Sequence, residues 1–123
     1  MTIKYNFDYH PSFKKEFKSI FKQCPNFKSD FKRFKKVINA DLNINKHELP
    51  KKYIQIHKRG YKIYFPIFKY RYFYCKDGNG SNLRFIFLIN RTEELIYFTE
   101  VYKKNKKENL DYKRIENLFI KTS

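Results

Sequence analysis

The segment 83–102, LRFIFLINRTEELIYFTEVY, decides the fold. Two runs of apolar and β-branched residues, 83–89 and 94–102, flank the polar turn NRTEE. Runs of this kind separated by a short polar turn are typical of an antiparallel β-hairpin. We expect this hairpin to lie in the core sheet of the protein.

The residues before the hairpin predict further strands. YIQIH at 53–57 and YKIYFPIFKYRYFYC at 61–75 are rich in aromatic and β-branched residues, and Gly60 allows a turn between them. Pro66 has no N–H to give to a β-ladder. We therefore expect an edge position or a bulge at Pro66.

The two ends of the chain predict another strand and three helices. Apolar residues alternate along 2–9, which indicates a strand. They recur at steps of three and four along 12–24 and 27–42, which predicts two amphipathic helices joined by the short break CPN at 24–26. We expect these helices to be roughly antiparallel, and we expect a third helix over 108–120.

These elements predict one α+β domain spanning residues 1–123. It would contain an N-terminal strand, a helical hairpin, an antiparallel sheet of three to four strands and a C-terminal helix. Cys24 and Cys75 have no metal-binding or redox spacing, so we expect reduced cysteines in a cytoplasmic protein. Because no long apolar run is present, we expect neither a signal peptide nor a membrane span.

Charge is the strongest bulk signal for function. The 28 Lys and Arg residues exceed the 12 Asp and Glu residues and give a formal net charge of +16. Such a field attracts polyanions: RNA, DNA, an acidic membrane surface or an acidic partner protein. The acids are scattered, the histidines lack metal-ligand spacing, and no glycine-rich phosphate loop occurs. We therefore expect no cofactor, and any phosphodiester cleavage to proceed without a metal ion.

Two longer stretches together show a family resemblance. The first, GSNLRFIFLIN…EELIYFTEVYKKNKKENLDYKRIENLF at 80–119, places an arginine early in one strand and a tyrosine with lysines at the end of the next. The second, KKEFKSIFKQCPNFKSDFKRFKKVI at 14–38, looks like a helical hairpin. In order, spacing and charge, nearly the whole chain resembles the RelE/ParE superfamily of toxin–antitoxin toxins, especially its RelE-type branch.

The resemblance implies a cytoplasmic toxin with a microbial RNase-like sheet. Many such toxins are endoribonucleases that cleave mRNA, often in the ribosomal A site, and so inhibit translation. A cognate antitoxin protein holds them inactive, so the chain would be a monomeric toxin or part of a toxin–antitoxin hetero-oligomer. Some relatives poison DNA gyrase and cleave nothing. A basic nucleic-acid-binding module without activity is the remaining alternative.

The resemblance also assigns candidate residues. Arg84 occupies the place of the strand arginine that contacts the scissile phosphate in cleaving members. Lys103 and Lys104 match the basic pair after the last strand. Tyr102 or Tyr112 matches an aromatic residue that stacks on a base or assists proton transfer.

The match is poorer where the family carries basic residues on its second strand, so the general base stays open. His57 is added to the catalytic candidates because it is the only histidine near the expected face. The catalytic candidates are thus Arg84, Lys103, Lys104, Tyr102 and His57. The nucleic-acid-binding candidates are Lys58, Arg59, Lys62, Lys69, Arg71, Lys106, Lys107 and Tyr112.

These residue types suit RNA cleavage by the neighbouring 2′-hydroxyl. The enzyme must align the reacting groups and stabilise the additional negative charge on the phosphate. A guanidinium binds two oxygens at once, and a lysine with a lowered pKa transfers protons. A simpler interpretation is a solvated lysine run, with Arg84 at a strand end, Tyr102 completing the core and His57 at the surface.

Overall fold

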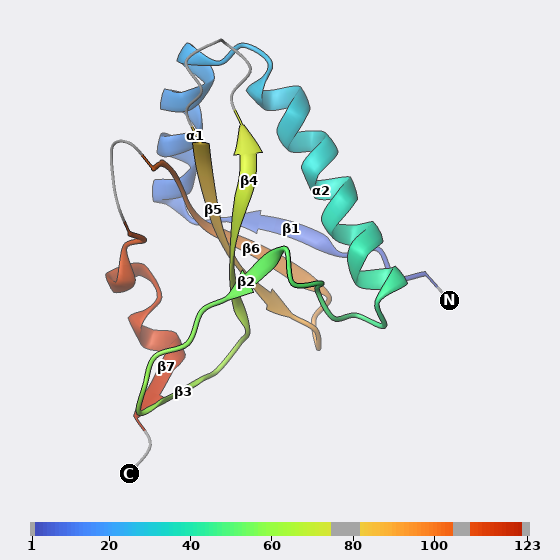
Figure 1. Cartoon of the computed structure of the whole chain (residues 1–123), viewed down its shortest axis with the longest axis vertical. Helices are drawn as coiled ribbons and strands as arrows, with labels where there is room; N and C mark the ends of the chain where they lie inside the picture. The colour runs from blue at the N-terminus through green and yellow to red at the C-terminus, as the bar shows by residue number, and fades with distance from the viewer. Residues whose placement is uncertain (1, 75–81, 105–108, 122–123) are drawn as a thin grey trace.

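The computed structural model describes residues 2–74, 82–104 and 109–121, and it has an α+β fold (Figure 1). A five-stranded sheet carries two α-helices on one face, and a small two-stranded sheet lies beside it. The elements in chain order are β1 (Asn6–Tyr9), α1 (Pro11–Gln23), α2 (Phe27–Ile44), β2 (Tyr53–Gln55), β3 (Tyr61–Ile63), β4 (Ile67–Tyr74), β5 (Asn82–Asn90), β6 (Leu95–Lys103), the 3₁₀-helices η1 (Tyr112–Arg114) and η2 (Glu116–Leu118), and β7 (Phe119–Lys121).

The five-stranded sheet has the order β1-β6-β5-β4-β2. The hairpin of β5 and β6 lies at its centre, as the sequence predicts, and β4 and β2 extend it in antiparallel fashion. The expectation of an antiparallel sheet of three to four strands is wrong, because β1 adds a fifth strand that runs parallel to β6. A strand joined to its sheet by helices, rather than by a tight turn, is free to run in either direction.

The helical hairpin is confirmed. Pro11 occupies the first turn of α1, where its missing N–H costs nothing, and the His10 side chain accepts a hydrogen bond from the Ser12 N–H at 3.0 Å. The apolar stripes of α1 and α2 pack against the sheet through an aromatic core. In that core the Phe31 and Phe85 rings stack with centroids 5.3 Å apart. The helices lie close together at their connecting turn and diverge toward their other ends (Figure 1).

The opposite face of the sheet has a smaller apolar cluster. Leu110 and Ile115, from the segment after β6, pack there with Ile86 and Leu88 of β5. Pro66 divides the expected strand 61–75 into two pieces. The first, β3, leaves the main sheet and pairs with β7, so Pro66 marks a break between strands.

The expectation of a C-terminal helix over 108–120 is wrong for the described part, 109–121, which forms two 3₁₀ turns and a short strand. The Asp111 side chain accepts a hydrogen bond from the Lys113 N–H at 3.0 Å, while the Asp111 N–H donates to Glu100 at 2.7 Å. The remainder of the segment 109–121 is held by the buried side chain of Ile115 and by the pairing of β7 with β3. These tertiary contacts outweigh the weak helical periodicity of the segment.

The cysteines also differ from expectation. Cys24, at the C-terminal cap of α1, is buried and disulfide-bonded, so it is not a reduced thiol. Cys75 lies outside the described residues. Sequence spacing identifies local metal and redox motifs, but it carries no information on which cysteines meet in space.

Two asparagines of α2 hold the N-terminal segment in place. Asn43 accepts a hydrogen bond from the Ile3 N–H at 2.7 Å and donates to the Ile3 and Asn39 carbonyls, each at 2.8 Å. Asn39 accepts a hydrogen bond from the Tyr5 N–H at 2.9 Å. These bonds satisfy backbone groups just before β1, which pairs with β6 at one edge of the sheet within the described residues.

Substitution of Asn43 by alanine tests this arrangement. We expect Asn43→Ala to lower the free energy of unfolding by about 1–3 kcal/mol, because it leaves part-buried backbone groups of the N-terminal segment unpaired. Urea unfolding followed by circular dichroism measures the change. Asn45→Ala is the matched control, because the Asn45 side chain is exposed and donates to the Asp41 carbonyl of its own helix. Equal losses in the two variants would contradict this role for Asn43.

Candidate nucleic-acid interface

Arg84 lies near the start of β5, on the face of the sheet opposite the helices. Its neighbours Leu83 and Phe85 point into the aromatic core, so strand alternation turns Arg84 the other way. The residue is only 7% exposed, and its Nη1 donates to the Arg71 carbonyl at 3.1 Å. A guanidinium held in this way is fixed before any ligand arrives.

A β-bulge in β6 decides which residues stand beside Arg84. Ile86 pairs with Glu100 and Phe87 pairs with Phe98, so Thr99 is the additional residue between them. The bulge shifts the alternation of β6 by one position. As a result Tyr102 lies directly opposite Arg84 on the face away from the helices.

Strand β4 brings two more cations to this face. Lys69 pairs with Ile86, and a second register shift lies between Tyr70 and Phe73, next to Arg71. Burial and then the positive charges of Arg71, Arg84 and Lys104 lower the pKa of Lys69. We call Lys69, Arg71, Arg84 and Lys104 the basic cluster.

Two tyrosines border the basic cluster. Tyr102 is 6% exposed, and burial followed by the nearby Glu100 carboxylate raises its pKa, while Arg84 acts in the opposite direction. The Tyr102 hydroxyl therefore stays protonated at neutral pH. Tyr112, in η1, also acts electrostatically on Tyr102, and its own ring is 44% exposed. The cluster thus has a buried hydroxyl and an accessible aromatic ring at its border.

Lys103 does not belong to the basic cluster, although it is adjacent to Lys104 in sequence. It pairs with Leu83, whose side chain points into the aromatic core, and its ammonium donates to the Gln23 side chain at the end of α1. Strand alternation therefore separates the expected lysine pair. Lys103 lies on the helix side of the sheet.

The basic residues between β2 and β3 also lie away from the cluster. The Ile56 N–H donates to the Ile67 carbonyl at the start of β4, whereas Arg71 lies further along that strand. The turn that follows Ile56 therefore sits at the other end of the strand. His57, Lys58, Arg59 and Lys62 lie in this turn and in β3, all of them exposed. Lys106 and Lys107 lie outside the described residues.

Acidic groups that were not predicted from the sequence support this face. Glu100 is 1% exposed, and its carboxylate accepts a hydrogen bond from the Asp111 N–H. Arg114 makes a bidentate pair with Glu16 of α1, with N–O distances of 2.9 and 2.7 Å, and donates to the Thr99 carbonyl. A charged residue at position 100, between Thr99 and Val101 in a predicted core strand, was the available signal.

Comparisons with protein-family models, curated proteins and solved structures find no match to this chain. Within residues 2–74, 82–104 and 109–121, no group of three or more His, Cys, Asp or Glu side chains is placed to hold a metal ion. Neither described α-helix is both long and apolar enough to cross a membrane. Function is therefore inferred from the geometry and charge of the site.

The electrostatic coupling within the basic cluster can be measured directly. We expect Arg84→Met to raise the pKa of Lys69 toward its ordinary value, because a neighbouring positive charge disappears. Burial remains, so the pKa stays lowered. Carbon-detected NMR titration of lysine side chains measures the shift, and Lys69→Arg assigns the signal. As a control, Arg59→Met, in the distant turn, should leave the pKa of Lys69 unchanged. An unchanged Lys69 pKa in Arg84→Met would contradict the coupling.

Proposed function

We propose that this protein is the toxin of a type II toxin–antitoxin system and acts as a metal-independent endoribonuclease of the RelE type. The observation that carries the proposal is the convergence of Lys69, Arg71, Arg84 and Lys104 beside Tyr102 on one face of the sheet. Cations gathered around a partly buried lysine and a tyrosine suit a phosphodiester that gains negative charge as it reacts. The proposed substrate is mRNA on the ribosome, and its cleavage would inhibit translation in the cytoplasm.

The proposed reaction uses the RNA's own 2′-hydroxyl as the nucleophile. The neutral Lys69 amine takes the proton from the 2′-hydroxyl, and O2′ attacks the adjacent phosphorus. The bond from phosphorus to the 5′-oxygen breaks, which leaves a 2′,3′-cyclic phosphate and a new 5′-hydroxyl end. Arg84 and Arg71 stabilise the charge on the phosphate oxygens, and the Tyr102 hydroxyl is the candidate donor of the proton that the leaving oxygen takes up.

The order of elements also supports the proposal. A strand, a helical hairpin and then an antiparallel run of strands follow one another as the family resemblance implies. The segment 109–121 departs from that pattern, because it contains 3₁₀ turns and a strand where the family has a helix. In the proposed system a cognate antitoxin pairs with the toxin and holds it inactive.

Controlled expression in bacteria tests the function. We expect wild-type protein to arrest growth and to create new mRNA ends in phase with codons, because the basic cluster aligns and cleaves the message. Arg84→Ala and Lys104→Met should abolish or strongly reduce both effects. Lys103→Met is the matched control for Lys104→Met and should stay toxic, because Lys103 points toward α1. Growth curves and transcriptome-wide mapping of RNA ends provide the two measurements.

Other outcomes of this experiment separate the alternatives. Growth arrest without new RNA ends would contradict cleavage and favour a gyrase-directed toxin. Folded protein that causes no arrest would favour a nucleic-acid-binding module. Because Arg84 is buried, Arg84→Lys is added as a variant that keeps the charge, and the thermal unfolding midpoint of each variant shows whether it folds.

The pH dependence of cleavage tests the role of Lys69. A lysine acts as a base only when neutral, and the lowered pKa of Lys69 makes its neutral fraction rise at a lower pH than for an ordinary lysine. We therefore expect the single-turnover cleavage rate of wild-type protein to rise with pH, after subtraction of spontaneous RNA hydrolysis. Lys69→Arg should be slow and lack this rise, because arginine stays protonated. Lys62→Arg should keep the wild-type profile, and an unchanged profile in Lys69→Arg would exclude Lys69 as the base.

A further inference from the structure

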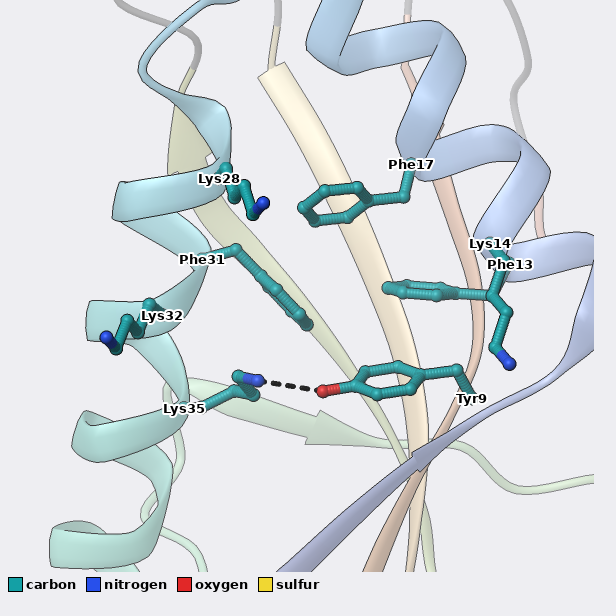
Figure 2. Close-up of a pocket in the computed structure, with 8 residues that line it drawn as sticks. All are labelled: Tyr9, Phe13, Lys14, Phe17, Lys28, Phe31, Lys32 and Lys35. Atoms are coloured by element: carbon teal, nitrogen blue, oxygen red, sulfur yellow. Dashed lines mark hydrogen bonds between the residues drawn. The ribbon is translucent and has the colours of Figure 1, made fainter.

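A second surface lies between α1 and α2, on the side of the sheet opposite the basic cluster. There the diverging helices leave an open groove of about 380 Å³. Its walls are aromatic: Phe13 and Phe17 come from α1, Phe31 from α2, and Tyr9 from β1 (Figure 2). The Phe17 and Phe31 rings approach each other with centroids 5.2 Å apart. The volume is in the range of small-ligand sites, which are concave and mainly apolar.

Lysines surround these aromatic walls. Lys28, Lys32 and Lys35 come from α2 and Lys14 from α1, and the residues that line the groove include no acid. An adjoining cavity of about 370 Å³ continues along α1 and shares Lys14, Phe17 and Lys28 with the groove. The surface therefore combines a compact apolar interior with positive charge on both sides.

Lys35 is the most firmly placed of these cations. Its ammonium donates to the Tyr9 hydroxyl at 2.8 Å, as Figure 2 shows, and lies 5.2 Å from the centre of the Phe31 ring. An ammonium has three N–H donors. The aromatic rings and the single hydroxyl orient Lys35 at one end of the groove without neutralising its charge.

We propose that this groove binds a small anionic amphiphile, of the class of medium-chain fatty acids. The carboxylate would pair with Lys35 and the Tyr9 hydroxyl, and the alkyl chain would lie along the groove against the Phe17 and Phe31 rings, toward Lys28. An apolar chain with one charged end matches aromatic walls that end at an oriented cation. A purely acidic peptide would use the lysines but leave the aromatic walls uncovered. This site is separate from the basic cluster, so the proposal does not depend on RNA cleavage.

Calorimetric titration of the purified protein with octanoate, decanoate and decanol tests the proposal. We expect decanoate to bind roughly fifteenfold more tightly than octanoate, because it has two more methylenes and each buried methylene contributes about fourfold. Decanoate should also bind at least tenfold more tightly than decanol, which lacks the charge. NMR shifts should locate the ligand at Tyr9 and Phe17.

Two lysine variants and one control complete the experiment. Lys35→Met should weaken decanoate binding about tenfold and leave decanol binding unchanged, and Lys28→Met should have a smaller effect. The matched control is Lys36→Met, because Lys36 is exposed on the same helix and does not line the groove. Thermal unfolding confirms that each variant folds. Absence of decanoate binding, equal affinity for decanol, equal loss in Lys36→Met, or equally tight binding of a polyglutamate peptide would overturn the proposal.

Discussion

The β-bulge at Thr99 is the constraint on which both faces of the sheet depend. Thr99 is the additional residue in the pairing of β6 with β5, and its hydroxyl donates to the Ile86 carbonyl at 3.2 Å. Because of it, Phe98 and Val101 both face the helices, although an odd number of positions separates them. Without the bulge, one of these two residues would leave the aromatic core. The same shift places Tyr102 beside Arg84 and turns Lys103 toward α1.

The bulge also explains how the segment after β6 is held. Glu100 follows Thr99 and accepts the Asp111 N–H, while the Thr99 carbonyl accepts a hydrogen bond from Arg114. Arg114 also pairs with the Glu16 carboxylate. The same carboxylate accepts a hydrogen bond from the Val101 N–H at 3.2 Å, and Val101 lies past the part of β6 that pairs with β1. A carboxylate therefore takes the place of a strand partner at this edge of β6. The hydrogen bond to Glu16 raises the pKa of Arg114 and outweighs the opposite effect of its burial.

The sequence was sufficient to predict the regular elements and insufficient to predict their irregularities. The periodicities of 12–24, 27–42 and 83–102 gave the helices and the central hairpin because each segment buries one continuous set of side chains. The bulges in β4 and β6 change the alternation by single residues, which no local pattern signals. The bulge in β6 places Tyr102 opposite Arg84 and turns Lys103 toward α1, away from the basic cluster, and the sequence pattern alone could not show this. The turns of 109–121 depend on Glu16 and Glu100, which are distant in sequence.

The basic cluster is electrostatically unfavourable in the absence of an anion. The charges of Arg71, Arg84 and Lys104 act against protonation of Lys69, and Glu100 is the one acid among the buried residues that the structure describes. The aromatic core on the other side of the same strands supplies the stabilisation that holds these cations together. A phosphate placed among them would remove the repulsion and add charge-assisted hydrogen bonds. Stability of the fold and affinity for an anion therefore oppose each other at this site, as is common where a protein keeps a preorganised binding surface.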